Sequence, residues 1–452
     1  MPISAPLAPM PPAHLLLGHL PERTHAPLDL FLSSQRALGD VVRYRMGYVH
    51  VEQLTHPDAV RHVLVEAPAR YTKGSIWDKM QPLVGIGLLT AEGEIWKQQR
   101  RVAQPVFHRD GVARLATTMT DTIAGHLRSW EPSATANGEL PVFPEMRQIT
   151  IDVVTRALFG ADLADHGSIP AAFTSALDVT NARIISPLPY LPWLYRVPTP
   201  ANLRFRRAMA TLDAVVGAII AKRQREASAA THDDLLGMLM TQSEPGTGDD
   251  DAGRLRDGVM TLLLGGYETT ATTLAWAFYL LGRHPDVEAR MRDEVESVLG
   301  GRTPTVADLA NLTYVRCVVE ETMRLYPAVW AVPRVAVVDD EVGGFRVPRG
   351  DIVVLVPYVT HRHPDFWPQP DRFDPDRFLP ANRLGAPRWA YVPFGGGQRQ
   401  CIGNTFAMMK AQFVLAMVTQ RFRLIPSTDA VVEPDASVTL RPRGAMPMRV
   451  SS

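Results

Sequence analysis

The chain has little cysteine, no net charge and no long apolar run, and each of these absences excludes a class of protein. Only Cys317 and Cys401 occur among the 452 residues. Two thiols cannot build a disulfide framework, which favours a reducing compartment where a free thiolate survives. The 47 Lys and Arg residues balance 47 Asp and Glu residues, so a nucleic-acid footprint or a polybasic membrane surface is not supported.

The N-terminal lead, residues 1–25, is rich in proline, and its only apolar run is Leu15-Leu16-Leu17. Spanning a bilayer takes about 20 apolar residues. No charged segment followed by a hydrophobic one marks a signal peptide either. We therefore expect no membrane anchor and a cytoplasmic location.

Hydrophobic periodicity, punctuated by proline and glycine, predicts a mainly helical chain. Alternation predicts a hairpin over 41–51, strands with turns over 335–356, and strands over 437–441 and 446–450. Helices are predicted over 57–64, 93–101, 110–130, 143–159, 173–183, 201–225, 254–283, 286–299, 314–326 and 404–422, with a solvated loop over 245–253. No linker divides the chain, so we expect one domain, residues 1–452, mainly α with a small β-rich part.

The most informative segment places one thiol among glycines, two residues after an arginine. It reads Phe394-Gly395-Gly396-Gly397-Gln398-Arg399-Gln400-Cys401-Ile402-Gly403. A thiolate that binds a metal needs a lowered pKa, which backbone N–H groups, a following helix N-terminus and a nearby cation provide. The glycines let the backbone curl around sulfur and let a flat ligand approach. Phe394 can shield the sulfur from water, and Arg399 can pair with an anionic group of the ligand.

This segment contains the whole pattern F-x-x-G-x-R-x-C-x-G and resembles the haem-binding loop of the cytochrome P-450 family. The resemblance implies that Cys401 is the axial thiolate of haem iron, with Phe394, Arg399 and Gly403 as further cofactor contacts. Motifs upstream, in the family's order, extend the resemblance over nearly the whole chain.

A second motif, Glu321-Thr322-Met323-Arg324, lies on a predicted helix, where the i, i+3 spacing puts acid and base on one face. An isolated pair of this kind is usually exposed and contributes only tenths of a kcal/mol. Pro375-Asp376-Arg377-Phe378 follows about fifty residues later. This order resembles the family's Glu-Arg-Arg network, which implies that Glu321, Arg324 and Arg377 lock the region under the haem. Asp376 stands where the family commonly has glutamate.

The run Gly265-Gly266-Tyr267-Glu268-Thr269-Thr270 lies midway along the long apolar helix. Two adjacent glycines cost about 1 kcal/mol each in a helix interior, so we expect a local distortion that leaves room for a diatomic ligand. The alternative is ordinary helix packing, with threonines bonded to a preceding carbonyl. The run matches the acid–alcohol pair of the family's oxygen-activating helix, which implies that Thr269 donates a hydrogen bond to bound O2 and that Glu268 connects it to bulk protons.

The segment Trp96-Lys97-Gln98-Gln99-Arg100 resembles the family's Trp-x-x-x-Arg motif, in which both end residues reach a haem propionate. Arg334 and Arg399 fall at matching family positions for the same role. Three arginines would satisfy two carboxylates that are otherwise costly to bury. Taken separately, each arginine is equally consistent with surface solvation.

The resemblance implies the triangular, mainly helical prism of the family, with haem b between the long oxygen-activating helix and the helix after Cys401. The implied reaction cleaves O2 reductively and inserts one oxygen atom into a C–H or C=C bond. Because the chain has no flavin or nicotinamide fingerprint, we expect electrons from a separate ferredoxin with ferredoxin reductase, or from a flavodoxin. Lys97, Arg101 and Lys410 are expected on the proximal face that meets this acidic partner. The protein is expected to be a monomer.

The predicted walls of the substrate pocket are nearly all apolar, which favours a medium-to-large hydrophobic substrate held mainly by burial. They are Trp77, Met80, Leu83, Ile185, Leu188, Leu262, Gly265, Ala328, Val329, Trp330, Val332 and Val438. A terpenoid, steroid, polyketide or fatty acid would each fit, and bacterial biosynthetic tailoring is the preferred role. Arg43 and Arg45 share one face of the hairpin, which we expect to face solvent rather than the pocket.

Two other functions stay open at this point. One is a haem protein that uses peroxide, or that isomerises an oxygenated substrate without reductant, although Glu268 and Thr269 argue against it. The other is a non-catalytic haem or gas sensor, whose Soret band no organic molecule would move. Cys317 is interpreted as an apolar filler of its helix.

Overall fold

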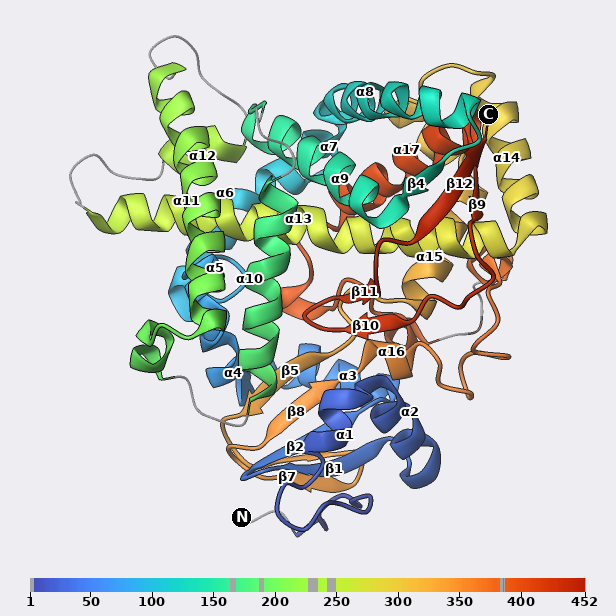
Figure 1. The fold of residues 1–452 in the computed structure, drawn as a ribbon. Helices are drawn as coiled ribbons and strands as arrows, with labels where there is room; N and C mark the ends of the chain where they lie inside the picture. The colour runs from blue at the N-terminus through green and yellow to red at the C-terminus, as the bar shows by residue number, and fades with distance from the viewer. Residues whose placement is uncertain are drawn as a thin grey trace.

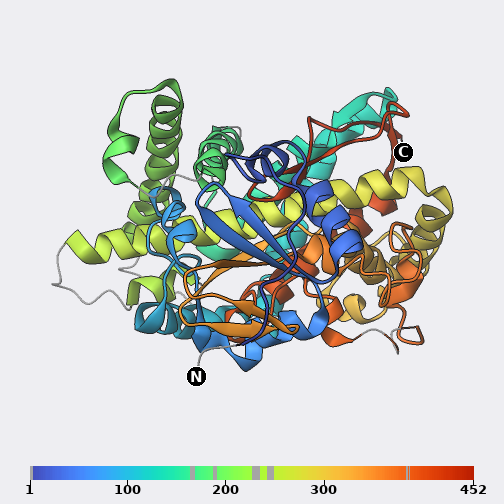
Figure 2. The ribbon, with the colours of Figure 1, turned by 90° about the horizontal axis from the view of Figure 1, so that it is seen from below.

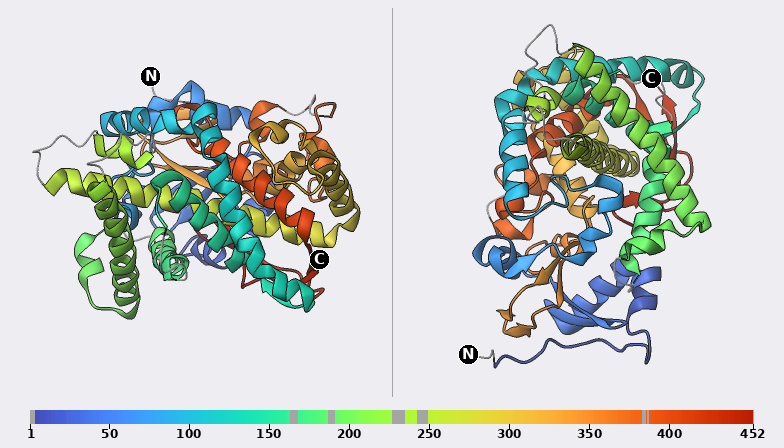
Figure 3. Two further views of the ribbon diagram at one scale, coloured as in Figure 1. Left: turned by 90° about the horizontal axis from the view of Figure 1, so that it is seen from above. Right: turned by 90° about the vertical axis from the view of Figure 1, so that its left-hand side faces the viewer.

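The long apolar helix of the sequence lies at the centre of the molecule. The computed structural model describes residues 4–162, 168–186, 191–226, 235–241, 249–382, 385 and 387–451. Helix α13 (Asp249–Arg283) has 35 residues, and the right-hand view of Figure 3 looks along it, with other helices on several sides. Leu263, Tyr267 and Trp276 are at most 1% exposed, as expected for a helix that is apolar all round. The helix begins at Asp249, inside the predicted solvated loop, because aspartates are also favoured in the first turn of a helix.

Three helices that matter for the candidate site pack directly against α13: α9 (Val142–Phe159), α15 (Thr313–Leu325) and α17 (Asn404–Arg421). The other helices of this part are α4 (Ser75–Asp78), α5 (Gln81–Val84), α6 (Gly93–Phe107), α7 (Arg109–Arg114), α8 (Ala116–Thr135), α10 (Ser168–Ile185), α11 (Pro200–Glu226), α12 (Leu235–Thr241) and α14 (Pro285–Leu299). Their apolar side chains form one large cluster, in which Cys317 is fully buried, as predicted for an apolar filler.

The smaller, β-rich part lies at the bottom of Figure 1 and in front of α13 in Figure 2. Its five-stranded sheet has the order β1-β2-β8-β5-β3, in which β2 and β8 are parallel and the other neighbours antiparallel. The strands are β1 (Val41–Met46), β2 (Val49–Leu54), β3 (Tyr71–Thr72), β5 (Val332–Ala336) and β8 (Ile352–Leu355). The short helices α1 (Leu20–His25), α2 (Pro27–Leu38), α3 (Pro57–Arg61) and α16 (Pro357–Thr360) belong to the same part.

Three smaller sheets complete the described structure. Strands β4 (Glu139–Pro141), β12 (Pro447–Ser451) and β9 (Arg423–Pro426) form one of them, β6 (Asp340–Val342) pairs with β7 (Phe345–Val347), and β10 (Pro434–Ala436) pairs with β11 (Leu440–Pro442). The mainly α architecture with a small β-rich part is therefore confirmed. Among the described residues, no helix combines the length and the apolar character that crossing a bilayer requires.

The hairpin of β1 and β2 forms as predicted, but its arginines do not point freely into solvent. Arg43 is 7% exposed and its guanidinium lies against Glu52 and, at 2.8 Å, against Asp351. Arg45 donates to the backbone carbonyl of Leu15 at 2.6 Å. The prediction for Arg43 was wrong because strand alternation gives the face of a side chain and not what covers that face.

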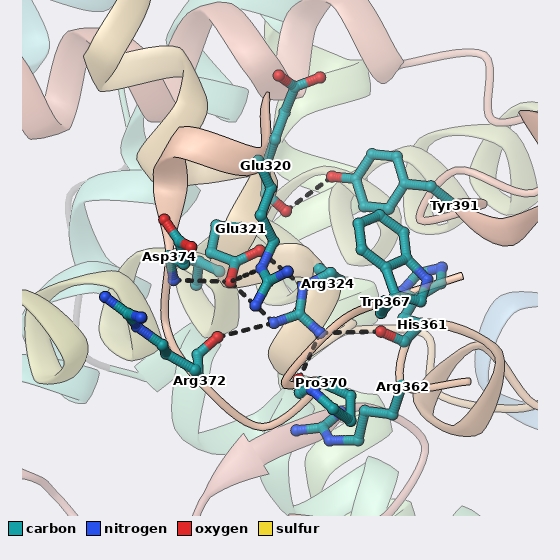
Figure 4. A network of polar contacts seen from close by, with 12 residues as sticks. Glu320, Glu321, Arg324, His361, Arg362, Trp367, Pro370, Arg372, Asp374 and Tyr391 are labelled. Atoms are coloured by element: carbon teal, nitrogen blue, oxygen red, sulfur yellow. Dashed lines mark hydrogen bonds and ion pairs between the residues drawn. The ribbon is translucent and has the colours of Figure 1, made fainter. Parts of the chain in front are cut away.

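A buried ion pair connects α15 to the irregular segment that precedes the Cys401 loop (Figure 4). Glu321 and Arg324 are both 0% exposed, and the guanidinium donates to the two carboxylate oxygens at 2.7 and 2.8 Å. The remaining N–H groups of Arg324 donate to the carbonyls of His361, Pro370 and Arg372 at 2.6–3.0 Å. This set satisfies a charge pair that would otherwise be costly to bury.

The same carboxylate also receives donors from the segment after residue 370. The backbone N–H of Asp374 donates to Glu321 at 2.8 Å, and Arg377 Nε lies 3.6 Å from the same oxygen. The three predicted network residues therefore come together. Asp376 faces another partner, Arg290, at 2.6 Å, so its place in the motif does not disturb Arg377.

Replacement of Arg324 by alanine is expected to destabilise the protein by about 3–5 kcal/mol, because it leaves the Glu321 carboxylate buried without its cation. Urea unfolding measures this change in the free energy of unfolding. The matched control is Arg443→Ala, which breaks an ion pair whose side chains are 67% and 65% exposed and should cost less than about 1 kcal/mol. Equal losses in the two variants would contradict the structural role of the network.

His361 gives the same region a predictable acid response. Burial, followed by the positive charges of Arg324 and Arg362, lowers the pKa of His361 from 6.5 to about 3, and its Nε2 accepts the backbone N–H of Val392 at 2.9 Å. Below pH 6.5 the unfolded chain takes up a proton that the folded chain refuses. The free energy of unfolding should therefore fall as the pH drops from 6.5 towards 3, by up to about 1.4 kcal/mol per pH unit.

His361→Gln keeps a hydrogen-bond acceptor but cannot titrate, so it isolates the histidine from the carboxylates that titrate in the same range. Unfolding in urea at pH 5 and pH 7 should show a smaller loss of stability for this variant than for the parent. The same pH dependence in both proteins would rule out His361 as its source.

Candidate functional site

The loop that carries Cys401 is shaped by its glycines. Gly395 and Gly397 have φ values of 66° and 64°, a conformation that side chains with a Cβ rarely adopt. A Cβ on Gly397 would also lie 2.0 Å from the carbonyl oxygen of Leu64. The chain turns back on itself so that the N–H of Cys401 donates to the carbonyl of Phe394 at 2.9 Å. The tight turn that the glycines predict is therefore present between Phe394 and Cys401.

Cys401 is an exposed residue, so the chain alone does not cover it. Burial raises the pKa of this thiol, whereas the backbone N–H of Gly403 and the charge of Arg100 lower it. Arg100 is fixed beside the loop, because its guanidinium donates to the carbonyl of Gln400 at 2.7 Å. The thiol thus has the backbone donor and the cation that a thiolate ligand needs.

The predicted arginines gather close to this loop. Arg399 donates to the carbonyl of Ala91 at 2.9 Å, and its guanidinium carbon lies 3.9 Å from the ring centre of Trp96. Burial, and then the charges of Arg334 and Arg100 against that of Glu92, lower the pKa of Arg399 to about 10. Burial also lowers the pKa of Arg334. Trp96 therefore supports one of the arginines with its ring.

Sequence reasoning missed Lys73, a fourth cation in this group. Its side chain is 7% exposed, its Nζ donates to the carbonyl of Leu89, and it lies 4.6 Å from the ring centre of Trp77. Burial, followed by the charges of Arg399 and Arg334, lowers the pKa of Lys73 to about 7. No local pattern marks this lysine, because its neighbours come from distant parts of the chain.

The charges of this group do not balance within the described residues. Four cations interact electrostatically with one another or with Glu92, namely Lys73, Arg100, Arg334 and Arg399. Among the described residues, Glu92 is the only carboxylate that acts on them. Cations that are close together and partly removed from water are unfavourable unless anions neutralise them. A ligand that carries two carboxylates would supply these anions, so the donor set fits the haem that the Cys401 loop implies.

The two glycines of α13 have different surroundings. A Cβ on Gly265 would meet no atom within 4 Å, whereas a Cβ on Gly266 would lie 2.9 Å from Val154 of α9. The helix runs on through both residues. Gly266 thus permits close packing of two helices, and Gly265 borders open space, so both glycines have a use besides the expected local distortion of the helix.

The acid and the alcohol on α13 both have partners in this structure. The Thr269 hydroxyl donates to the carbonyl of Gly265 at 2.9 Å, which is the packing alternative considered for this motif. Glu268 is 1% exposed and accepts from Arg147 Nε and Nη2 at 3.1 and 2.7 Å. Arg147 also donates to Thr174 at 2.8 Å. It was missed because it is 121 residues from Glu268 in sequence.

Several predicted pocket residues keep part of their surface exposed or lie next to Gly265 along α13. Leu262 is one turn before Gly265 on the same face of α13, and the Trp77 indole N–H donates to the carbonyl of Pro333 at 3.5 Å. Val329 is 40% exposed. Ala328, Val332, Val438 and Ile185 are partly exposed. Leu188 lies outside the described residues.

Three other predicted pocket residues are packing residues. Met80 and Leu83 are 2% and 0% exposed and belong to the central cluster. Trp330 is 3% exposed, and its indole N–H donates to the carbonyl of Ser437 at 2.8 Å. Its ring packs against Phe31 of α2. Trp330 is therefore buried, whereas its neighbour Val329 is exposed.

The expected basic face is also revised. Lys97 and Arg101 are exposed, and Lys97 pairs with Glu94 at 2.6 Å. Lys410 is 0% exposed, because α17 is covered on almost all sides. It cannot contact a partner protein.

Comparisons with known proteins agree with this geometry. A model of the cytochrome P-450 family matches residues 8–447. The chain is 37% identical over 414 residues to cyclooctat-9-en-7-ol 5-monooxygenase of Streptomyces melanosporofaciens, covering 91% of this chain and 88% of that protein. It is 33% identical over 437 residues to pentalenene oxygenase of Streptomyces avermitilis, covering 95% of this chain and 94% of that protein.

A crystal structure of a cytochrome P-450 haem domain matches the fold with a TM-score of 0.87 and 26% identity, covering 99% of this chain and 98% of that one. The match extends over the helical and the β-rich part alike. Since the family model spans almost the entire length and the haem domain has the same fold, this chain belongs to the cytochrome P-450 family and is one of its haem-thiolate monooxygenases.

Proposed function

We propose that this enzyme inserts one oxygen atom from O2 into a C–H or C=C bond of a terpenoid. The observation that carries the proposal is the open space beside Gly265 on the central helix α13, one turn from Thr269. Leu262 presents an apolar side chain on the same face, which supports a hydrophobic substrate held by burial. The names of the two relatives, which refer to terpene oxidation, favour a terpenoid over a steroid, polyketide or fatty acid.

The proposed cofactor is haem b, which when bound supplies the activation of O2. Cys401 would hold the iron as a thiolate, with Phe394 and Gly403 around the sulfur. The two carboxylates of the haem would be bound by Arg100, Arg334 and Arg399, with the Trp96 ring packed against the Arg399 guanidinium. Lys73 would add a fourth cation, so that two ligand carboxylates and Glu92 face four positive groups.

Protons would reach the reacting oxygen through Thr269 and Glu268. The Thr269 hydroxyl would leave the carbonyl of Gly265 and donate towards the open space. Glu268 would have to leave Arg147 before it can carry a proton, because both of its carboxylate oxygens accept from that guanidinium. Arg147 is therefore proposed to bind the Glu268 carboxylate between turnovers, so that Glu268 carries a proton only after this ion pair has opened.

Electrons would come from a separate protein, either a ferredoxin with ferredoxin reductase or a flavodoxin. The exposed Lys97 and Arg101 remain the proposed contacts for an acidic partner. A single domain over residues 1–452, a monomeric state and a cytoplasmic location stay predictions of the sequence.

The ligand assignment predicts that the reduced protein with carbon monoxide shows the long-wavelength Soret band that thiolate ligation implies. Cys401→His should abolish this band. Cys317→Ala is the matched control: it removes the other thiol, which is fully buried in the core, and should keep the band. A thiolate spectrum in Cys401→His would show that another group binds the iron.

The substrate assignment predicts that apolar terpenes shift the Soret band from low to high spin in a saturable titration, as substrate displaces water. Gly265→Val should weaken this binding at least about tenfold, equivalent to about 1.4 kcal/mol, because its side chain fills the open space. Gly217→Val on the exposed side of α11 is the control, since a Cβ there also meets no atom within 4 Å.

Two results would contradict the substrate assignment. Spectral shifts only with small, strongly polar compounds would exclude an apolar pocket. Unchanged terpene binding in Gly265→Val would place the pocket elsewhere. A Soret band that no organic molecule moves would favour the sensor function instead.

A further inference from the structure

A buried lysine connects the two helices that flank the proposed haem. Lys410 lies on α17, the helix that follows Cys401, and its side chain is 0% exposed. Its Nζ donates to the carbonyl oxygen of Gly266 on α13 at 2.6 Å. Gly266 is two residues before Glu268 and three before Thr269. The lysine therefore contacts the backbone of the oxygen-activating helix one turn before the acid–alcohol pair.

The ammonium group has no carboxylate beside it among the described residues. Among the described residues, the ammonium also lies over the ring of Phe406, whose centre is 5.2 Å from Nζ. Burial alone lowers the pKa of Lys410 to about 7, so no nearby acid offsets the desolvation of the charge. An apolar side chain of similar length would fill this position at a lower cost. The hydrogen bond to Gly266 is thus the one hydrogen bond that a lysine makes here and a methionine cannot, beside the contact of the ammonium with the Phe406 ring.

This hydrogen bond acts on a helix that is held from the other side as well. At Gly266, α13 approaches Val154 of α9 so closely that a Cβ would lie 2.9 Å from that side chain. The preceding carbonyl, that of Gly265, receives the Thr269 hydroxyl. The carbonyl of Gly266 also receives the Thr270 hydroxyl, at 3.4 Å. Two successive carbonyls of this turn therefore accept side-chain donors, that of Gly265 from α13 alone and that of Gly266 from both α13 and α17. Donors of this kind draw carbonyls outward and bend a helix.

We propose that Lys410 is a positioning residue that clamps the backbone of α13 at Gly266 and thereby fixes Glu268 and Thr269 relative to the Cys401 helix. The clamp acts through the N–H donor of the lysine. The inference rests on the proposed function for its catalytic consequence, but the clamp itself is a property of the fold.

The test compares Lys410→Met, which keeps the length and apolar stem but removes the donor, with Lys410→Gln, which keeps an N–H donor without charge. Hydrogen exchange of the α13 amides, measured on the haem-loaded protein without reductant, reports the clamp directly. In Lys410→Met, exchange around residues 266–270 should be at least about threefold faster than in the parent. Lys410→Gln should lie between the two. Arg421→Met is the matched control, because Arg421 lies on the same helix and its side chain is 40% exposed.

The catalytic consequence is measured as the share of reducing equivalents that ends as hydrogen peroxide rather than hydroxylated product. Lys410→Met should keep the thiolate spectrum with carbon monoxide yet raise this share at least about threefold. Thr269→Ala serves as a reference, since loss of the alcohol should also divert equivalents to peroxide. Lys410→Gln should recover part of the coupling, and Arg421→Met should behave as the parent.

Parental exchange and parental coupling in Lys410→Met would overturn the proposal. Equal defects in Lys410→Gln and Lys410→Met would also overturn it, because the donor would then not be the cause. So would a Lys410→Met variant that does not fold, since the methionine should pack at least as well as the ammonium. Absence of the thiolate spectrum in the parent would instead refute the proposed function, while the exchange measurement would still decide the clamp.

Discussion

The ion pair between Glu321 and Arg324 is the interaction on which the rest of the structure depends. Both side chains are 0% exposed, and a buried pair is tolerated only when every remaining donor and acceptor is used. Arg324 uses the carbonyls of His361, Pro370 and Arg372. The chain between the five-stranded sheet and the Cys401 loop is thereby folded around one guanidinium. His361 continues this chain of contacts to Val392, two residues before the loop begins.

The sequence predicted those parts of the site whose chemistry is local. The glycines, the arginine and the thiol of the Cys401 loop act on one another within ten residues, and Glu321 and Arg324 lie three residues apart on one helix. Partners from distant segments left no such signal, as Arg147 and Lys73 show. The sequence also did not show how deeply a side chain is buried. Lys410 lies on a helix that is covered on nearly all sides, and the sequence does not distinguish a lysine on such a helix from a lysine at the surface.

The glycine pair of α13 shows that one residue type can meet two different packing needs. A conformational cost at both positions predicted a local distortion of the helix. The structure uses the missing Cβ twice, once to let α13 touch α9 and once to leave open space. Both uses depend on the neighbours of the helix, which the helix propensity of glycine does not describe. Helix propensity therefore singled out this segment of α13 but did not predict the packing around it.

The buried charges of this enzyme fall into two groups: those neutralised by other residues of the chain and those that a ligand must neutralise. Arg324 and Glu268 each have an opposite charge supplied by the chain, from Glu321 and Arg147. The group of Lys73, Arg100, Arg334 and Arg399 has only Glu92, so its balance requires anions that the described chain does not provide. Unpaired cations repel one another in a low dielectric. Binding of a dicarboxylate ligand should therefore stabilise the fold as well as equip it for catalysis.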